Sequence, residues 1–315
     1  MIKGAIVLLV VTALANEKAN WGFFAHREIN RLAVFTLPEP LIKFYKAHLQ
    51  IIIKNAVNPD KRRYIINGEA PRHYIDLDGY GDSALFKLPE NWFKAVKKYT
   101  EDTLIAYGIV PWHIYRVKNQ LTSAFVKKDV ERILNLSADL GHYIGDANVP
   151  LHTTENYNGQ LTGQKGIHGF WESRLPELYF ENYSFWVGAA NYEPDPQQRA
   201  WKAVENANKA LDSVLWFESR LNLKFDEDRK YSFEARGNSI KKVYSKEYSK
   251  SYHNKLSGMV ERQMQRSVKM VGDFWYTCWV DAGKPDLNDM SLLELSIKNK
   301  RDSVQKLIKS RPHEN

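Results

Sequence analysis

Apolar residues recur at helical spacing along most of this chain, and that periodicity constrains the fold more than any other feature. Between residues 129 and 144 they occupy one face of a helix (Val130, Ile133, Leu134, Leu136 and Leu140). The segment 255–281 carries a similar stripe (Met259, Met264, Val268, Val271 and Phe274). Runs that alternate between apolar and polar residues, which are typical of strands, are almost absent. We therefore predict an all-α fold.

The same pattern predicts helices over nine segments: 28–37, 40–54, 92–108, 112–127, 129–144, 168–178, 197–221, 233–250 and 255–281. Loops rich in Gly, Asn and Asp separate several of them, as at 76–82 and 156–166. No linker divides the chain, so residues 21–284 are expected to form a single multi-helix domain. The charged tail 285–315 is expected to add a peripheral helix over 292–307.

The N-terminus has the pattern of a secretory signal peptide. Lys3 precedes the apolar run Ala5–Leu14, and Ala13-Leu14-Ala15 fits a small-x-small cleavage site. The run is too short to span a bilayer, and no later segment is apolar for 18 residues, so we expect no transmembrane segment. We predict a signal peptide over 1–15, with a cut as late as residue 20 as a variant, and a secreted or periplasmic protein. A buried N-terminal helix is the alternative.

Cysteine usage and charge limit the chemistry. Cys278 is the single cysteine, which excludes an internal disulfide and a thiolate metal site and predicts a small buried side chain. Any metal must therefore be bound by nitrogen and oxygen. The formal net charge of +8 suits a phosphate-bearing partner or an anionic surface, although solvated basic faces give the same balance.

Histidine and carboxylate pairs in one short segment predict a metal site. His142 and Asp146 are four residues apart, and so are His168 and Glu172, so each pair shares one helix face. His152 lies between the pairs, just after Pro150 ends the first helix. Imidazole and carboxylate are the ligands that zinc prefers when thiolates are absent. The alternative is a set of hydrogen-bonded core or surface histidines.

Outside this segment, His26, Asp60 and His73 could each be structural when taken alone. Together with the pairs, however, they complete an ordered series that resembles the zinc ligands of one superfamily. That superfamily joins the zinc-dependent bacterial phospholipases C and the single-strand-specific nucleases of fungi and plants. The series is Trp21, His26, Asp60, His73, His142, Asp146, His152, His168 and Glu172.

The resemblance implies three Zn²⁺ ions held between the helices of an all-α domain. The implied ligands are Asp60, His73 and His142 for the first zinc; His26 and the backbone of Trp21 for a second, with Asp146 bridging the two; and His152, His168 and Glu172 for the third. It also implies a catalytic role for Asp60, which would orient a zinc-bound hydroxide that attacks phosphorus. Zinc chemistry supports this role, because a bound ion lowers the pKa of its water to about 7.

One departure from the family concerns Trp21. In the family the mature chain begins at this Trp, whose free amine binds metal. Cleavage after Ala15 would leave residues 16–20 ahead of Trp21, and two zinc ions would then be expected.

The remaining histidines and nearby acids are expected outside the ligand set. We predict that His48 lies on the surface, that His253 and His313 are solvated, and that His113 packs in the core rather than at a cleft rim. Tyr74, Asp76 and Asp78 could line or support the cleft. We place most weight on Asp76, because carboxylates often orient metal-bound histidines.

The predicted function is a secreted zinc-dependent phosphodiester hydrolase, phospholipase C-like, acting on a phospholipid head group. A nuclease acting on single-stranded nucleic acid is an almost equal alternative, because exposed tyrosines suit base stacking as well as a cation cage. A non-catalytic zinc-binding surface protein is the alternative of another class. No obligate protein partner is evident.

Overall fold

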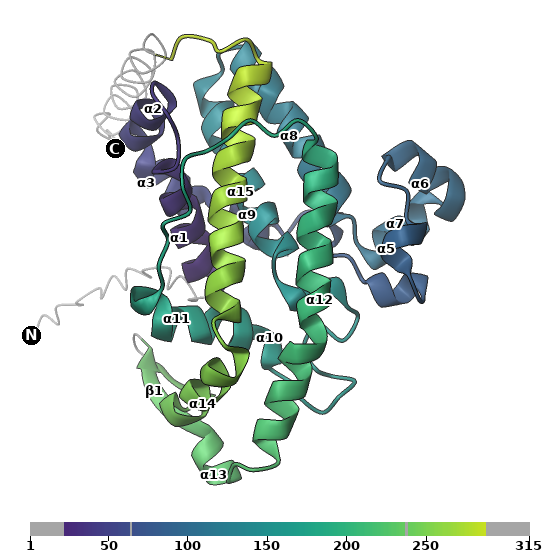
Figure 1. Ribbon diagram of the computed structural model, residues 1–315, viewed down its shortest axis with the longest axis vertical. Coiled ribbons are helices and arrows are strands. Elements are labelled where there is room, and N and C mark those ends of the chain that lie inside the picture. The colour runs from purple at the N-terminus through teal and green to yellow at the C-terminus, as the bar shows by residue number, and fades with distance from the viewer. Residues whose placement is uncertain (1–21, 64, 237–238, 288–315) are drawn as a thin grey trace, which may run out of the picture.

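A computed structural model describes residues 22–63, 65–236 and 239–287, and it is all-α apart from one short hairpin (Figure 1). Five helices are long: α1 (Phe23–Val34), α8 (Val110–Val126), α9 (Val130–Ala147), α12 (Pro196–Asn222) and α15 (Met259–Asp281). The shorter helices are α2 (Leu41–Ala47), α3 (Leu49–Asn55), α4 (Asn58–Arg62), α5 (Ala84–Lys87), α6 (Trp92–Tyr99), α7 (Glu101–Tyr107), α10 (Ile167–Gly169), α11 (Leu175–Tyr179), α13 (Glu227–Lys230) and α14 (Lys246–Leu256). Single turns are η1 (Ala70–Arg72), η2 (Leu77–Tyr80), η3 (Pro150–Thr153), the π-helical η4 (Phe170–Arg174) and η5 (Phe180–Asn182). The predicted all-α class is confirmed.

Helix α9 lies at the centre of the molecule. It contacts α1, α3, α8, α12 and α15, and every residue from 140 to 150 is buried. Asp129 begins this helix by accepting a hydrogen bond from the Arg132 amide at 3.0 Å, as a good N-cap does. Burial of each large aliphatic side chain of this helix stabilises the fold by about 1.5–3 kcal/mol. The second half of α9 is therefore a fixed support for the side chains that it carries.

Aromatic packing ties α9 to its neighbours. The Trp275 ring of α15 stacks on Tyr45 with centroids 4.7 Å apart, and its indole N–H donates to the Ser137 carbonyl of α9. Tyr45 also shares a hydrogen bond with the Ser137 hydroxyl at 2.8 Å. Cys278 is fully buried on α15, as the sequence predicts.

The helix expected over 233–250 is wrong. Residues Tyr231–Arg236 and Ser239–Tyr244 form antiparallel strands β1 and β2, and α14 begins only at Lys246. Most of β2 is exposed, from Ser239 to Lys242, and only its end packs on the helical body, through the buried Val243 and the half-buried Tyr244. Packing of that end on the body therefore favours the strand, although the segment has no clear period-two pattern.

Two further expected helices are each broken in the middle. The segment 40–54 divides at His48 into α2 and α3, and 92–108 divides at Thr100, whose φ of 68° no continuous helix allows. The segment 168–178 is continuous, but it passes through the π-helical turn η4. No helix of the described residues combines the length and apolar character needed to cross a membrane. The expected signal peptide, Trp21 and the tail helix 292–307 lie outside the described residues.

Candidate metal centre

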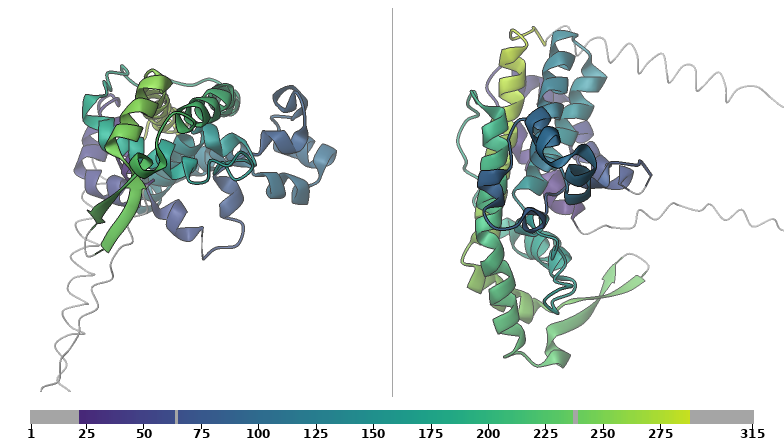
Figure 2. Two further views of the ribbon diagram at one scale, coloured as in Figure 1. Left: turned by 90° about the horizontal axis from the view of Figure 1, so that it is seen from below. Right: turned by 90° about the vertical axis from the view of Figure 1, so that its right-hand side faces the viewer.

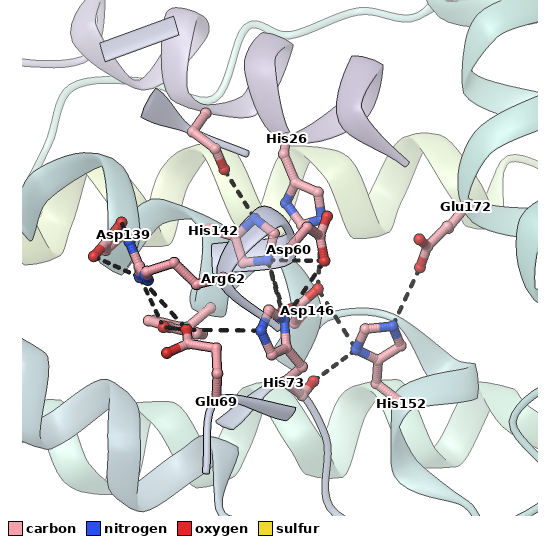
Figure 3. Close-up of polar contacts among 12 residues, drawn as sticks. His26, Asp60, Arg62, Glu69, His73, Asp139, His142, Asp146, His152 and Glu172 are labelled. Atoms are coloured by element: carbon pink, nitrogen blue, oxygen red, sulfur yellow. Dashed lines mark hydrogen bonds and ion pairs between the residues drawn. The ribbon is translucent and has the colours of Figure 1, made fainter. Parts of the chain in front are cut away.

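Seven separate elements bring the predicted ligands together. Helix α9 carries His142 and Asp146 on one face, and α1 supplies His26. Asp60 comes from α4 and His73 from the residue after η1. The others follow along the chain from η3, α10 and η4: His152, His168 and Glu172. The structure thus brings together eight of the nine predicted residues, and Trp21 lies outside its description. Figure 3 labels each of the eight except His168.

Two glycines let α1 approach α9 closely. A Cβ atom on Gly145 would lie 2.9 Å from Nδ1 of His26, and one on Gly141 would lie 1.9 Å from Oδ1 of Asn30. Both distances are too short for a real side chain. Because Gly141 and Gly145 carry no side chain, His26 can lie directly against His142. The two imidazole rings stack with their centroids 3.9 Å apart.

One group of donor atoms consists of Asp60, His73 and His142. Nε2 of His142 lies 3.1 Å from Nδ1 of His73, and these two nitrogens lie 3.7 and 3.8 Å from Oδ1 of Asp60. Asp146 Oδ2 lies 2.9 Å from the same His73 nitrogen. The four side chains therefore point at one small volume.

Asp146 connects this group to two others. Its Oδ1 atom lies 3.4 Å from Nε2 of His26, which together with His142 forms the second group. The same oxygen lies 3.5 Å from Nδ1 of His152. In the third group, Nε2 of His152 and Nε2 of His168 are 3.0 Å apart, and Glu172 Oε2 lies 3.3 and 2.9 Å from them.

The donor set fits metal ions, because the outer ring nitrogens fix which nitrogens face inward. His142 Nδ1 lies 2.8 Å from the Ala56 carbonyl, and His152 Nδ1 lies 2.7 Å from the His73 carbonyl. A nitrogen beside a carbonyl oxygen must carry the proton and donate it. Each Nε2 lone pair then points into its donor group, which is the usual arrangement of metal-bound histidines.

The charges in the cluster also favour cations. Burial acts to raise the pKa of Asp146, but His142 and His152 hold that pKa well below its usual range. Glu172 is likewise buried, and His168 and His152 keep its pKa low. Burial, together with His142, lowers the pKa of His26 to about 4. At neutral pH both carboxylates are therefore ionised and His26 is neutral. Burial acts to lower the pKa of His142 and of His152, but Asp146 raises each to about 9, so a metal ion must displace their protons when it binds.

The ligands differ in access to solvent. The Asp146 and His142 side chains are essentially inaccessible, whereas those of Asp60, His168 and Glu172 keep 22, 19 and 17% of their surface exposed. The cluster is thus closed toward α9 and open on the side of α4 and α10. Catalytic metal sites keep such open positions for water and substrate.

Sequence reasoning missed Glu69, a fully buried carboxylate behind His73. It pairs with Arg72 at 2.6 Å and with Arg62 at 3.4 Å, and it accepts a hydrogen bond from the Tyr143 hydroxyl. Oε1 of Glu69 lies 3.9 Å from Nε2 of His73, and that nitrogen has no hydrogen-bond partner in the described part of the chain. The four-residue spacing of Glu69 and His73 in the sequence could have indicated that this carboxylate lies beside a metal ligand.

Predictions for the other histidines had mixed outcomes. His113 is buried edge-on against Tyr143, which confirms core packing. His48 is buried and hydrogen-bonds the Phe44 carbonyl, so the predicted surface position is wrong. His253 is half-buried and shares a hydrogen bond with the Tyr183 hydroxyl, so it is less solvated than expected. His313 lies outside the described residues.

The three residues expected at the cleft lie beside the cluster. Asp78 accepts hydrogen bonds from the Thr154 hydroxyl and the Glu155 amide, so it fastens the loop after His152. Asp76 and Tyr74 are half-buried. Burial, with Asp78 and Glu155 nearby, raises the pKa of Asp76 to about 7.

Comparison with known proteins identifies no family. No family model and no curated protein matches the chain. Among solved structures, it is similar to the crystal structure of an alpha-toxin of Clostridium perfringens from an avian strain, with 12% sequence identity and a TM-score of 0.48. The match covers 84% of this chain and 65% of the toxin chain, so the chain spans less than two thirds of that protein.

Proposed function

We propose that this chain is a secreted, zinc-dependent hydrolase of phosphodiester bonds, related to the phospholipase C and single-strand nuclease superfamily. The observation that carries the proposal is the convergence of eight histidine and carboxylate side chains into three adjoining donor groups linked by Asp146. Structural zinc sites are closed by four protein ligands. In this cluster, by contrast, adjoining donor groups share ligands, and one side is open. Secretion is proposed from the N-terminal pattern alone.

The donor types identify the chemistry. Zinc ions bound here would supply a nucleophilic water at neutral pH and offset the charge that develops on phosphoryl oxygens. Among the residues, Asp60 combines a position beside His73 and His142 with an exposed edge. It can therefore accept a proton from water and orient that water toward a substrate. Asp146, which has no such exposure, holds the buried histidines in place.

The substrate is proposed to be a phospholipid head group, with single-stranded nucleic acid as the second candidate. The position of Tyr157 supports single-stranded nucleic acid as the second candidate substrate. Its ring is half exposed and lies 5.8 Å from the His168 ring, at the open side of the cluster. An exposed tyrosine there can stack on a base or contact a quaternary ammonium.

The test is a direct comparison of substrates. Protein purified without added metal is analysed for zinc and then assayed on phosphatidylcholine, single-stranded DNA and RNA, with and without a zinc chelator. Chelator-sensitive release of phosphocholine supports the phospholipase C assignment, and chelator-sensitive release of nucleotides supports the nuclease. Bound zinc without turnover of any substrate would favour a non-catalytic zinc-binding protein. Protein without zinc would contradict the metalloenzyme.

A variant pair locates the reaction within the cluster. Asp60→Asn is expected to reduce the turnover rate by about 100-fold or more, because water loses both its orientation and its proton acceptor. Asp102→Asn, an exposed aspartate on α7, is the matched control and should keep full turnover. Equal rates for both variants would remove Asp60 from the mechanism.

The mature N-terminus decides the expected zinc count. Sequencing of the secreted protein should show a first residue at Asn16 or at Trp21. A start at Trp21 predicts three zinc ions per chain, since the family resemblance assigns the free amine of such a first residue to the zinc that His26 would bind. A start at Asn16 predicts two.

A further inference from the structure

Large apolar side chains are exposed on each of the segments that border the open side of the metal cluster. Ile65 and Ile66 follow α4, which carries Asp60. Tyr157 and Leu161 lie between His152 and His168 in the chain. Phe233 and Ile240 lie on the hairpin and are each 74% exposed. Large exposed apolar groups that gather around one site indicate an interaction surface.

The hairpin presents its apolar side chains on a single face. Phe233 pairs with Lys242, and Ala235 pairs with Ile240, so these four residues share the outer face of the two strands. The other face carries the buried Val243. At the base of the hairpin, Tyr244 of the outer face packs on the body as well, so the exposed part of the outer face includes Phe233, Ile240 and Lys242. The exposed face is therefore a fixed feature of the fold.

Direct contacts attach the hairpin to the ligand-bearing segment. Tyr244 of β2 stacks on Phe170 with centroids 3.9 Å apart, and Phe170 lies two residues from both His168 and Glu172. Arg174 of the same segment binds both carboxylate oxygens of Glu234 at 2.9 and 2.5 Å. The hairpin is thus positioned beside the third donor group.

The protruding segments extend from a common side of the molecule. In both views of Figure 2 the hairpin and the chain between α4 and η1 project away from the layer formed by α12 and α15. Exposed lysines accompany the apolar side chains, at Lys165 in the loop before α10 and at Lys242 on the outer face of β2, while the exposed Lys241 lies on the other face of that strand. This side therefore combines apolar tips with positive charge.

We infer that these six residues, the apolar rim (Ile65, Ile66, Tyr157, Leu161, Phe233 and Ile240), dock the protein on a lipid bilayer that contains anionic lipid. Separate protruding tips suit a deformable interface, into which each tip can insert on its own. The lysines suit the negative surface of such a bilayer, which attracts basic side chains that lie close to it. The docked bilayer would then face Asp60, His168 and Glu172.

The inference rests on the proposed function, because the rim surrounds the proposed active site. Its test measures vesicle binding and does not require turnover. Wild-type protein that keeps its bound metal is mixed on ice with vesicles of phosphatidylcholine alone or with phosphatidylglycerol, and the bound fraction is measured by sedimentation directly after mixing. We expect binding that is stronger with phosphatidylglycerol and that weakens as salt is added. Hydrolysis can thus fail while vesicle binding succeeds, and the reverse.

Paired substitutions test the residues themselves. Phe233→Ser combined with Ile240→Ser is expected to reduce vesicle partitioning at least about tenfold, because two large apolar side chains no longer leave water. The control is Phe93→Ser on α6, a similarly exposed phenylalanine in a part of the molecule away from the hairpin. Lys241→Gln combined with Lys242→Gln should reduce mainly the preference for phosphatidylglycerol. Thermal unfolding shows whether each variant is folded.

A fluorescent label reports insertion directly. Ile240→Cys can be labelled with an environment-sensitive dye, because the native Cys278 is fully buried and its pKa is raised to about 12 by that burial. Addition of phosphatidylglycerol vesicles should shift the dye emission to the blue, as for an apolar environment. The same dye on Phe93→Cys should not respond.

Several results would overturn the inference. These are a wild-type chain that binds neither vesicle, and a Phe233/Ile240 double variant that binds as well as the wild type. A third is self-association that the double variant abolishes, which would make the rim an interface between copies. A fourth is single-stranded DNA that binds to the rim in competition with vesicles and with higher affinity.

Discussion

At the scale of single residues, the cluster depends on groups behind the ligands as much as on the ligands. Glu69 does not enter any donor group, yet it lies against the ring of His73 and is held there by Arg62 and Arg72. Tyr143 completes this support from α9. A buried carboxylate of this kind orients a metal-bound histidine and raises its basicity.

We therefore expect Glu69→Gln to weaken zinc binding by about 10–100-fold. The substitution removes the negative charge beside His73 and leaves Arg72 without its carboxylate partner, whereas Arg62 keeps Asp139, so the free energy of unfolding should also fall. Zinc affinity is measured by competition with a chromophoric chelator. Glu39→Gln, at an exposed pair with Lys43, is the control. Unchanged zinc affinity in Glu69→Gln would show that the carboxylate only supports the fold.

His113 gives a pH dependence outside the ligand set. Burial and the nearby Arg72, Arg116 and Arg62 hold its pKa well below 6.5 in the folded protein. The unfolded chain binds a proton below pH of about 6.5 while the folded chain does not. Stability is therefore lost as pH falls through that value, by up to about 1.4 kcal/mol per pH unit.

His113→Asn should remove this part of the pH dependence. Chemical unfolding of the wild type and the variant is compared at about pH 8 and about pH 5.5, on either side of the pKa of an unperturbed histidine. At the higher pH, the difference in free energy of unfolding between the wild type and the variant measures the packing lost against Tyr143. The wild type should lose more stability than the variant on acidification, and parallel losses would contradict the assignment.

At the scale of elements, the close approach of α1 to α9 positions His26. Gly141 and Gly145 are one helical turn apart and leave room for Asn30 and His26 on the facing helix. Asn30 donates a hydrogen bond to the Ala138 carbonyl at 3.0 Å, which fixes the contact. The α1–α9 contact thus has a specific role in the site.

Gly141→Ala should lower the free energy of unfolding by about 1–3 kcal/mol, because the added methyl group would overlap the Asn30 amide. This loss runs against helix propensity, which favours Ala over Gly by about 1 kcal/mol. Denaturant unfolding measures the change. In an Asn30→Ala background the same substitution should cost much less, as expected for residues in direct contact. Equal costs in the two backgrounds would place the strain elsewhere.

At the scale of the whole molecule, the metal cluster joins segments that are distant in sequence. Residues of α1, α4, η3 and η4 come together at the donor groups beside α9. Without cations, several ionised or protonated groups would remain together in a buried site. Bound zinc should therefore stabilise the entire fold rather than one loop.

Addition of zinc to metal-free protein should raise the unfolding temperature by roughly 5–10 °C, because a ligand at 100 times its Kd contributes about 2.7 kcal/mol. Differential scanning calorimetry with and without chelator measures the shift. His142→Ala should lose most of the response, since His142 belongs to two donor groups. His253→Ala, remote from the cluster, should keep it. A shift that survives in His142→Ala would indicate zinc binding at another site.

Helical periodicity is local, so the amino-acid sequence was enough to predict the fold class and the positions of most long helices. It also indicated which histidines and carboxylates converge. Spacing of four residues fixes His142 with Asp146 and His168 with Glu172 on shared faces before any tertiary contact forms.

Features that depend on contacts between distant segments became visible only in the folded structure. It placed Glu69 behind His73 and buried His48, because neither neighbour is specified by local spacing. It also turned the segment 233–250 into a hairpin and a shorter helix, since Tyr244 packs on Phe170 and Arg174 pairs with Glu234. Strand structure there is stabilised by packing on the helical body, and packing partners far along the chain leave no periodic signal in the strand itself.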